Sequence, residues 1–398
     1  MYKVTQRIKE FNKDRLPDKL QLKYEFMSEN MFRFYRGTCH LFYEDLHQYG
    51  SIVSSPLTWI CGDLHLENFG SYKGDNRLVY FDLNDFDEAC LAPVSFELSR
   101  VITSIFVAFS SLKIKESEAI TMAKLFLNTY SETLKKGKAY YIEPQTAKGI
   151  VSTFLSSVCE RKEKEILQRF TILKKGKLVL SLDKIHFFKL DKMLKKQLYQ
   201  HGTKWLSEHD MKYEIKDIVF RVAGTGSVGC RRYVFLLENR KQVEKYILLE
   251  MKEADASSLQ PYLKTPQPKW KNHAERVITV EERMQNVSAA LLATTVFDKH
   301  DFIIQEMQPV KDSIDLMSIK THPKDIRQVI SDMAMLTASA QLRSSGRQGA
   351  AIADDLIAFG NNDKWQKEIL DYSILYKKQV EKDYREFCMD YKKGALKK

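Results

Sequence analysis

Two short stretches close to the N-terminus form the densest groups of carboxylate, amide and imidazole side chains in the chain. Residues 62–70 read GDLHLENFG, and residues 81–88 read FDLNDFDE. Phosphoryl transfer needs a carboxylate at the attacking hydroxyl, together with an amide oxygen and a further carboxylate that hold Mg²⁺ against the phosphates. The side chains of the two stretches therefore fit ATP- and Mg²⁺-dependent transfer of phosphate to a hydroxyl.

The spacing within the first stretch indicates separate roles for its members. Asp63 and Asn68 are five residues apart, which separates the base from the metal-binding Asn in the template H-R-D-L-x-x-x-N. We expect Asp63 to accept the hydroxyl proton and Asn68 to bind metal. His65 is a second catalytic candidate, although a histidine inside such a loop more often orients the loop by hydrogen bonding. The competing interpretation is a polar hairpin whose Asp and Asn side chains cap turns.

Three acids of the second stretch compete for the role of metal-binding aspartate. Asp82 directly follows an apolar run and lies 14 residues after Asn68, whereas Asp85 precedes Phe86, as in the Asp-Phe-Gly motif. We expect Asp85 first and Asp82 second, with Asp87 at a second ion or beside the first. Carboxylates this close repel one another unless a cation or hydrogen-bond donors compensate, so at least one is expected to meet Mg²⁺.

A third informative block lies in the middle of the chain, where glycines 224, 226 and 229 form the pattern G-x-G-x-x-G. In one interpretation these glycines form a hairpin turn whose backbone N–H groups cover the phosphates, and a lysine on the next strand pairs with them. The expected phosphate contacts are then Gly224, Thr225, Gly226, Ser227, Gly229 and Lys252. An acid on the following helix should steady the lysine, and the candidates are Glu275, Glu281 and Glu282.

The same pattern occurs in dinucleotide-binding units, where it opens a helix and an acid about 20 residues later meets the ribose. Glu250 lies 21 residues after Gly229 and is the candidate acid. Residues 231–237, RRYVFLL, are rich in strand formers and lack a helical face, which favours a strand and hence the hairpin interpretation. A later run predicts the last strand of the sheet and a hinge, where the backbone at Glu306 and Met307 could meet an adenine edge.

The composition sets broad limits. The chain has 398 residues with a net charge of +11 and a pI near 9.1, which suits an anionic partner such as nucleotide, phosphorylated substrate, nucleic acid or membrane surface. No specific nucleic-acid motif is present.

The longest apolar run, 101–112, is shorter than a membrane span needs. The N-terminus has no apolar signal core, so we expect a cytoplasmic protein. The six cysteines show no Cys-x-x-Cys pair, and we expect free thiols.

The periodicity of the apolar residues predicts an α+β chain of two lobes. Helical spacing over 20–48 precedes short strands at 57–61 and 78–81, with a hairpin turn at 73–76 between the two polar stretches. Helices are expected at 94–112, 116–136 and 186–200, then strands at 217–222, 232–237 and 246–251. A helix at 272–288, a strand at 301–307 and helices at 323–345 and 363–391 complete the prediction.

These motifs resemble those of the protein-kinase-like superfamily, in particular the aminoglycoside phosphotransferase and choline kinase branch. The strings FYRG at 34–37, GDLHLENFG, FDLNDFDE, the glycine block and MKEA at 251–254 are also similar to a bacterial family catalogued as domain of unknown function 2252. The resemblance covers most of the chain. It implies Asp63 as base, Asn68 and Asp85 or Asp82 as metal ligands, and the glycines with Lys252 as phosphate contacts.

The sequence departs from the resemblance at two places. Cys61 replaces the histidine of the family's His-Gly-Asp, and residues 340–343 read AQLR where an Ala-His-Ala-Arg-like string is expected. The motif order is also inverted, because the catalytic stretches come before the glycine block. We therefore expect a circularly permuted kinase-like fold, in which 213–310 form a β-rich nucleotide lobe and 1–212 with 311–398 form a helical lobe. The alternatives are AMP transfer on the same fold and a nucleotide-binding scaffold without turnover.

Overall fold

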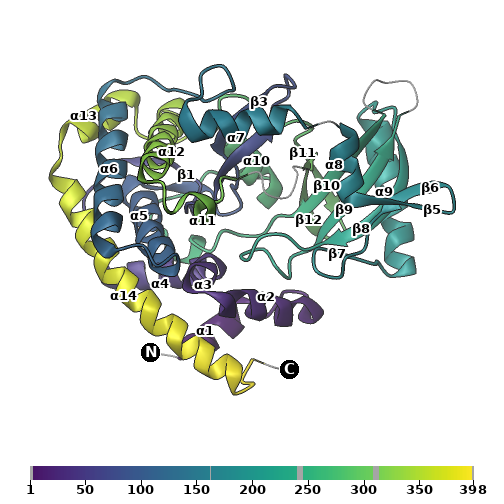
Figure 1. Cartoon of the computed structure of the whole chain (residues 1–398), viewed down its shortest axis with the longest axis horizontal. Helices are drawn as coiled ribbons and strands as arrows, with labels where there is room; N and C mark the ends of the chain where they lie inside the picture. Colours follow the sequence, from purple (N-terminus) through teal and green to yellow (C-terminus); the bar gives the residue numbers. More distant parts are fainter. Residues whose placement is uncertain (1–2, 162, 240–244, 308–312, 397–398) are drawn as a thin grey trace.

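The computed structural model describes residues 3–161, 163–239, 245–307 and 313–396 and has an α+β architecture (Figure 1). The N-terminal part contains α1 Val4–Phe11, α2 Pro17–Glu29, α3 Met31–Gly37, α4 Cys39–Tyr49, β1 Leu57–Ile60, β2 Phe69–Lys73, β3 Val79–Leu83, β4 Cys90–Pro93, α5 Val94–Ser111, α6 Glu116–Lys135 and α7 Gly149–Cys159. The C-terminal part contains α11 Leu316–Ile319, α12 Pro323–Ser344, α13 Ala353–Asn361 and α14 Lys364–Lys392. Both parts share one hydrophobic core, so segments from opposite ends of the chain build one helical body.

The middle of the chain forms a six-stranded antiparallel sheet in the order β11-β12-β10-β9-β8-β7. Its elements are α8 Glu163–Phe170, β5 Thr171–Lys174, β6 Lys177–Leu180, β7 Phe187–Phe188, α9 Lys192–Glu208, β8 Glu214–Arg221, β9 Arg232–Glu238, β10 Tyr246–Glu253, the 3₁₀ turn Gln260–Tyr262, α10 His273–Met284, β11 Ala293–Phe297 and β12 His300–Glu306. β5 and β6 form a separate hairpin beside this sheet.

The central strand β9 shows why its sequence is apolar without alternation. Phe235 and Leu237 enter one hydrophobic core, which contains Trp205 of α9, while Val234 and Leu236 enter another core on the opposite face. Because neighbouring residues of a strand point to opposite faces, a strand buried on both sides must be apolar throughout. The predicted lobe boundary at 212 therefore falls between α9 and the sheet on which α9 packs.

Helix α5 is the core helix of the helical body. Among the described residues, it is the one helix that is long and apolar enough to cross a membrane, and 83% of its 18-residue apolar window is buried inside the protein. It also carries the fully buried side chains Glu97 and Arg100, and both face the catalytic stretch. The six cysteines are free, as expected.

Most of the predicted elements are present, including the hairpin that joins the two polar stretches, since β2 pairs with β3 from Phe69 and Leu83 to Lys73 and Val79. The expected helix 186–200 is only partly correct, because β7 occupies its first residues and α9 begins at Lys192. The sequence patterns did not predict α1, β4, α7, α8, the β5–β6 hairpin, β11, α11 and α13.

Candidate functional site

Residues 62–70, residues 81–88 (the acidic stretch) and the glycine block meet at one cavity of about 510 Å³. Asn68 and Gly226, which are far apart in the sequence, both line it. Of the residues predicted from the sequence, those that line the cavity are Asp63, His65, Asn68, Asp85, Asp87, Gly224, Thr225, Gly226, Ser227 and Gly229. The fold therefore brings two distant parts of the chain to opposite walls of one cavity.

The loop before Asp63 is held by Glu97 and Tyr43, in a chain that has Cys61 where the kinase-like motif has a histidine. Glu97 Oε1 accepts hydrogen bonds from the backbone N–H of Cys61 at 2.7 Å and of Gly62 at 3.2 Å, and the Tyr43 hydroxyl donates to the Gly62 carbonyl. Gly62 has φ +83°, and a Cβ there would lie 2.3 Å from the carbonyl oxygen of Glu88. Only glycine fits this position without displacing the acidic stretch.

Residues 340–343, which depart from the expected string, support this loop from behind. Gln341 Nε2 donates to Glu97 Oε2 at 3.2 Å, and the Tyr130 hydroxyl donates to the Gln341 side-chain oxygen. Burial raises the pKa of Glu97 to about 7, against the opposing hydrogen bonds from Gly62, Cys61 and Gln341. Glu97 and Gln341 are thus buried positioning groups of the catalytic loop.

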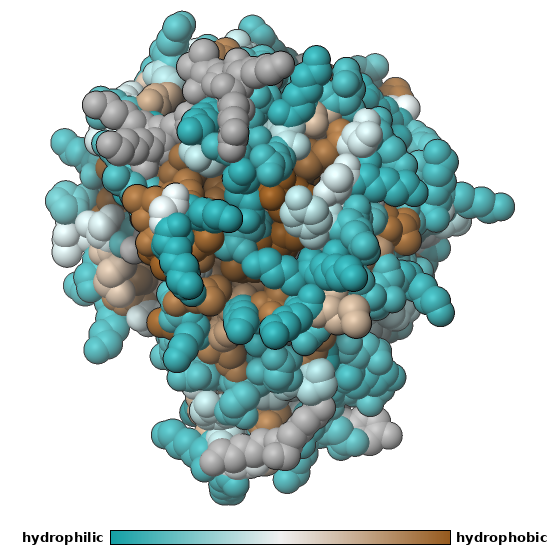
Figure 2. All heavy atoms as spheres, turned by 90° about the vertical axis from the view of Figure 1, so that its right-hand side faces the viewer, coloured by the Kyte–Doolittle hydropathy of each residue, from teal (hydrophilic) through white to brown (hydrophobic). Residues whose placement is uncertain are grey.

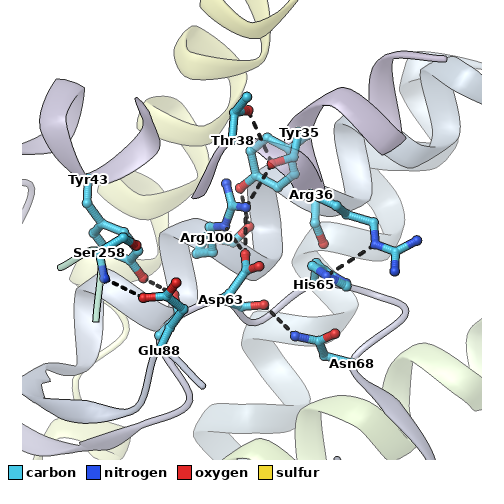
Figure 3. A network of polar contacts seen from close by, with 12 residues as sticks. Tyr35, Arg36, Thr38, Tyr43, Asp63, His65, Asn68, Glu88, Arg100 and Ser258 are labelled. Atoms are coloured by element: carbon cyan, nitrogen blue, oxygen red, sulfur yellow. Dashed lines mark hydrogen bonds and ion pairs between the residues drawn. The ribbon is translucent and has the colours of Figure 1, made fainter. Parts of the chain in front are cut away.

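Asp63 is paired with a buried arginine (Figure 3). Arg100 of α5 donates to Asp63 Oδ1 from Nε at 3.0 Å and from Nη2 at 2.6 Å, and its guanidinium lies 3.6 Å from the Tyr35 ring centroid. The side chain of Arg100 is completely buried, whereas that of Asp63 is 18% exposed. Burial raises the pKa of Asp63, and the Arg100 charge opposes that rise. Arg100 therefore favours the ionised carboxylate and fixes the direction of Oδ1.

Asn68 takes its orientation from the same loop. Its Nδ2 donates to the Asp63 carbonyl at 2.7 Å (Figure 3), and the residue is 5% exposed. Within the described residues, the side-chain oxygen of Asn68 accepts no hydrogen bond from protein, although Asn68 lines the cavity. An amide oxygen that accepts no hydrogen bond from the described residues is available to bind a cation.

A nitrogen donor lies near each ring nitrogen of His65, and a neutral imidazole accepts a hydrogen bond from one of them. Arg36 Nε lies 3.3 Å from Nε2, and the backbone nitrogen of Glu67 lies 3.2 Å from Nδ1. Burial and the nearby Arg36 charge lower the pKa of His65 well below its usual value, so the imidazole is neutral. The geometry matches the loop-orienting interpretation of His65.

The three competing acids occupy different places. Asp85 and Asp87 line the cavity, and Lys252 Nζ lies 3.4 Å from Asp85 Oδ1 and 2.5 Å from Asp87 Oδ2. Burial disfavours the ammonium, but the two carboxylates outweigh burial and raise the pKa of Lys252. Asp82 is 2% exposed and pairs with Arg343 at 3.1 Å, outside the residues that line the cavity. Of the two expected ligands, Asp85 and not Asp82 lines the cavity together with Asn68.

The glycine block is a loop between β8 and β9, and a strand, not a helix, follows it. Gly224 and Gly229 have φ +70° and +97°, a conformation that other residues adopt at a cost. The helical body binds the loop carbonyls: Arg15 Nη1 donates to Gly226 O at 2.5 Å and Val228 O at 2.8 Å. Lys23 Nζ donates to Gly226 O at 2.6 Å and is fully buried.

Other predicted residues lie away from the cavity lining. Glu250 is buried and paired with Arg221 and Arg232, so this acid is already neutralised and the dinucleotide interpretation loses its ribose contact. The Glu306 N–H donates to the Ala290 carbonyl at 3.0 Å, the Met307 N–H donates to the Leu248 carbonyl, and neither residue lines the cavity. The structure therefore leaves neither backbone at the cavity, and residue 308 of the expected hinge is outside the described residues.

Among the acids expected to steady Lys252, Glu281 is the one whose pKa responds to this lysine. Burial raises the pKa of Glu281 to about 8, and the Lys252 charge opposes the rise. Glu275 instead pairs with Lys271. The described part of the chain shows no ion pair between Lys252 and any of the three acids, because Asp85 and Asp87 occupy its ammonium.

The donor atoms at the cavity suit Mg²⁺. Asn68, Asp85 and Asp87 offer only oxygen atoms, and Mg²⁺ is usually bound by one or two carboxylates together with water and substrate phosphates. In the residues that the structure describes, no three His, Cys, Asp or Glu side chains form a metal site by themselves. A magnesium ion here would need the Asn68 oxygen and phosphate oxygens to complete its shell.

The site residues that sequence reasoning missed are the fully buried Arg100, Glu97 and Lys23 and the partly buried Arg15. Each stands in a helix or its flank, and its partner is remote in the sequence, so no local spacing marks it. The available signal was a charged side chain inside an otherwise apolar helix, as for Glu97 and Arg100 in α5, because charged groups are rarely fully buried without a partner.

The fold and the cavity define an α+β protein with a polar cavity between a helical body and an antiparallel sheet. The chain matches the family DUF2252, described as "Uncharacterized protein conserved in bacteria", over residues 15–390, and it belongs to that family. The resemblance to domain of unknown function 2252, predicted from the motifs, is thereby confirmed. No curated protein and no solved structure matches the chain.

Proposed function

We propose that the protein is an ATP- and Mg²⁺-dependent phosphotransferase with a circularly permuted kinase-like fold. The observation that carries this proposal is the meeting of three motifs at one cavity: the Asp63–Asn68 loop, the Asp85–Asp87 acids with Lys252, and the glycine loop. These are the parts that phosphoryl transfer requires. The common core of residues from both ends of the chain supports the permutation, since it joins segments of 3–161 and 313–396 into one helical lobe.

Each residue has a role that its contacts support. Asp63 orients the acceptor hydroxyl and takes its proton, while Arg100 keeps the carboxylate ionised and fixed. The glycine loop and Lys252 hold phosphate oxygens, and Asn68, Asp85 and Asp87 would hold Mg²⁺. The ion, when bound, neutralises the charge of the phosphates. Because phosphoryl transfer needs little covalent help from the protein, positioning and charge neutralisation account for most of the catalysis.

The ion pair of Lys252 adds a requirement to this scheme. Its ammonium lies between Asp85 and Asp87, so it occupies the acids that would bind the metal. Nucleotide phosphates offer Lys252 a different anionic partner, which releases the two carboxylates. We therefore expect nucleotide and Mg²⁺ to bind together more tightly than either binds alone.

A nucleotide-binding protein without turnover is the second candidate, and the Asp63–Arg100 pair favours it, because a guanidinium on the carboxylate weakens the base. A thermal-shift series separates the candidates. Stabilisation by ATP only when Mg²⁺ is present supports the enzyme, as ligand binding to the native state raises the unfolding temperature. Stabilisation by NAD supports the dinucleotide interpretation, and no response to any nucleotide refutes the proposed site.

Turnover is tested by mass spectrometry of candidate hydroxyl acceptors incubated with ATP and Mg²⁺. A gain of phosphate identifies the phosphotransferase, whereas a gain of AMP identifies transfer with the nucleotide reversed. The Asp63→Asn variant should lose the product while keeping the thermal shift with ATP and Mg²⁺, since Asn68 and Lys252 remain. Unchanged turnover in this variant removes Asp63 from the mechanism.

A further inference from the structure

The positive charge of the chain is concentrated in one segment. Residues 169–196 contain nine Lys and Arg against two Asp, which gives this segment a net +7 of the chain's +11. The segment begins at the end of α8, forms the β5–β6 hairpin and β7, and ends in α9. It makes no contribution to the cavity lining, so its charge is not explained by the proposed nucleotide site.

The hairpin presents this charge at the outer end of the sheet. β5 and β6 pair from Thr171 and Leu180 to Lys174 and Lys177, and the hairpin projects from the side of the molecule at the right of Figure 1. The turn between the strands contains Lys175 and Gly176 in positive φ. One end of the hairpin therefore carries three lysines within four residues.

Alternation along the strands separates the two faces of the hairpin. Thr171 and Leu180 are buried against the protein, so the residues next to them point outward. Ile172 lies opposite Val179, and Lys174 lies opposite Lys177. The outward face thus places an aliphatic pair beside a pair of lysines.

Exposed aliphatic side chains continue around the hairpin. Ile172 is 51% exposed and Leu173 is 77% exposed, and the loop after β6 adds Leu182 at 47% and Ile185 at 52%. Figure 2 views this end of the molecule and shows apolar side chains open to solvent among hydrophilic ones. We call the set Ile172, Leu173, Lys174, Lys175, Lys177, Leu182, Lys184 and Ile185 the hairpin surface.

The lysines of the hairpin surface have no carboxylate of their own. In the described ranges, no ion pair is found for Lys174, Lys175, Lys177 or Lys184, whereas the neighbouring Asp217 is already bound by Lys195. Asp183 accepts backbone N–H groups of Ile185, His186 and Phe187. The surface therefore combines free positive charge with exposed apolar area, and each needs an external partner.

The residue types favour a lipid surface over other anions. Lysine is depleted at protein–protein interfaces, where aromatic residues and arginine are enriched. Binding of single-stranded nucleic acid uses aromatic side chains for stacking, but Phe170 and Phe187 of this segment are buried, and the phosphates of a duplex offer no partner for the exposed aliphatic side chains. Aliphatic side chains that enter the headgroup boundary, with lysines that reach anionic headgroups along their flexible stems, form a typical interfacial binding surface.

We propose that the hairpin surface binds the protein peripherally to an anionic lipid bilayer. The exposed end of the β5–β6 hairpin lies on the membrane, so that Ile172 and Leu173, which stand on its two faces, reach the acyl boundary and Lys174, Lys175 and Lys177 lie among anionic headgroups. No helix crosses the bilayer in this arrangement, and α5 stays in the core of the helical body. The proposal does not depend on phosphotransfer activity.

The test is co-sedimentation of the full chain with vesicles of phosphatidylcholine and phosphatidylglycerol in equal parts, or of phosphatidylcholine alone. We expect binding to the mixed vesicles that weakens with salt, and little binding to the neutral ones. Since each lysine near an anionic surface contributes about fivefold in affinity, the triple variant Lys174→Glu/Lys175→Glu/Lys177→Glu should lose about 100-fold or more. Ile172→Ser/Leu173→Ser should lose about tenfold or more at unchanged charge.

Matched control variants on α14 test whether the hairpin surface is the part of the protein that binds the membrane. Lys382→Glu/Lys392→Glu/Lys393→Glu makes the same charge change on exposed positions of α14 and its C-terminal flank, and Leu375→Ser/Met389→Ser removes two aliphatic side chains that are 53% and 56% exposed there. Both should bind vesicles like the wild type. Equal losses in hairpin and control variants would overturn the proposal, as would full vesicle binding by the aliphatic variant or tighter binding to duplex DNA or RNA. Unchanged thermal unfolding confirms that the variants fold.

Discussion

Replacing Arg100 with methionine tests the central ion pair of the cavity. The side chain of Arg100 is completely buried and donates two hydrogen bonds to Asp63 Oδ1. Removal of one partner from a buried pair leaves an uncompensated charge, which typically costs about 3–5 kcal/mol. The variant also loses the contact with the Tyr35 ring, worth about 0.5–2 kcal/mol and independent of Asp63. We therefore expect a loss of about 4–6 kcal/mol in the free energy of unfolding.

A double-mutant cycle isolates the part of this loss that belongs to the pair. Asp63→Asn keeps the shape and an acceptor oxygen but removes the charge that Arg100 neutralises, and urea unfolding measures both single variants and the double variant. We expect the double variant to be more stable than the sum of the single losses predicts, by about 2 kcal/mol. Losses that add within about 0.5 kcal/mol would refute the coupling. The exposed pair Lys367–Asp371 supplies a control, since Lys367→Met should add to Asp63→Asn without coupling.

Three further changes have defined outcomes. The pKa of Glu97 is raised from 4.5 to about 7 in the folded protein, so between these pH values the folded protein holds a proton that the unfolded chain releases. As the pH rises from 4.5 to about 7, the contribution of Glu97 to the free energy of unfolding should therefore fall by about 1.4 kcal/mol per pH unit. Glu97→Gln should remove that slope from unfolding curves measured across pH. Gly62→Ala should cost about 3 kcal/mol or more in urea unfolding, because its Cβ meets the Glu88 carbonyl and its positive φ is strained; a near-neutral change would contradict the backbone description. Lys252→Met should strengthen binding of Mg²⁺ alone in isothermal titration, since it frees two carboxylates; weaker binding would show that these acids do not hold the ion.

Several strands, such as β8, β9 and β10, and the loops that carry the candidate site residues were predictable because their signals are local. Asp63 and Asn68 stand in one short string, and the turn after β2 has ordinary hairpin residues. The run after Gly229 has consecutive apolar residues because β9 is covered on both faces. Such patterns depend on neighbours in the sequence, which are visible without coordinates.

The partners of the site depend on tertiary packing and were not predictable in the same way. Asp82 and Asp85 look equivalent in the sequence, and their difference is that Arg343, from the other end of the chain, pairs with Asp82. Lys252 was identified as a phosphate contact, but its pairing with Asp87 follows from how β10 crosses the acidic stretch. The β5–β6 hairpin was missed because its lysines read as an ordinary solvated run.

The hydrogen bonds between the N-terminal segment and the glycine loop affect how shortened versions of the protein should be designed. Arg15 and Lys23 bind the loop through its carbonyls, and the Leu16 N–H donates to the Gly229 carbonyl at 2.9 Å. A recombinant fragment that starts at α3 would keep every residue to which we assign chemistry. It would still leave the phosphate-facing loop without its anchors, so failure of such a fragment to bind ATP would say nothing against the intact chain.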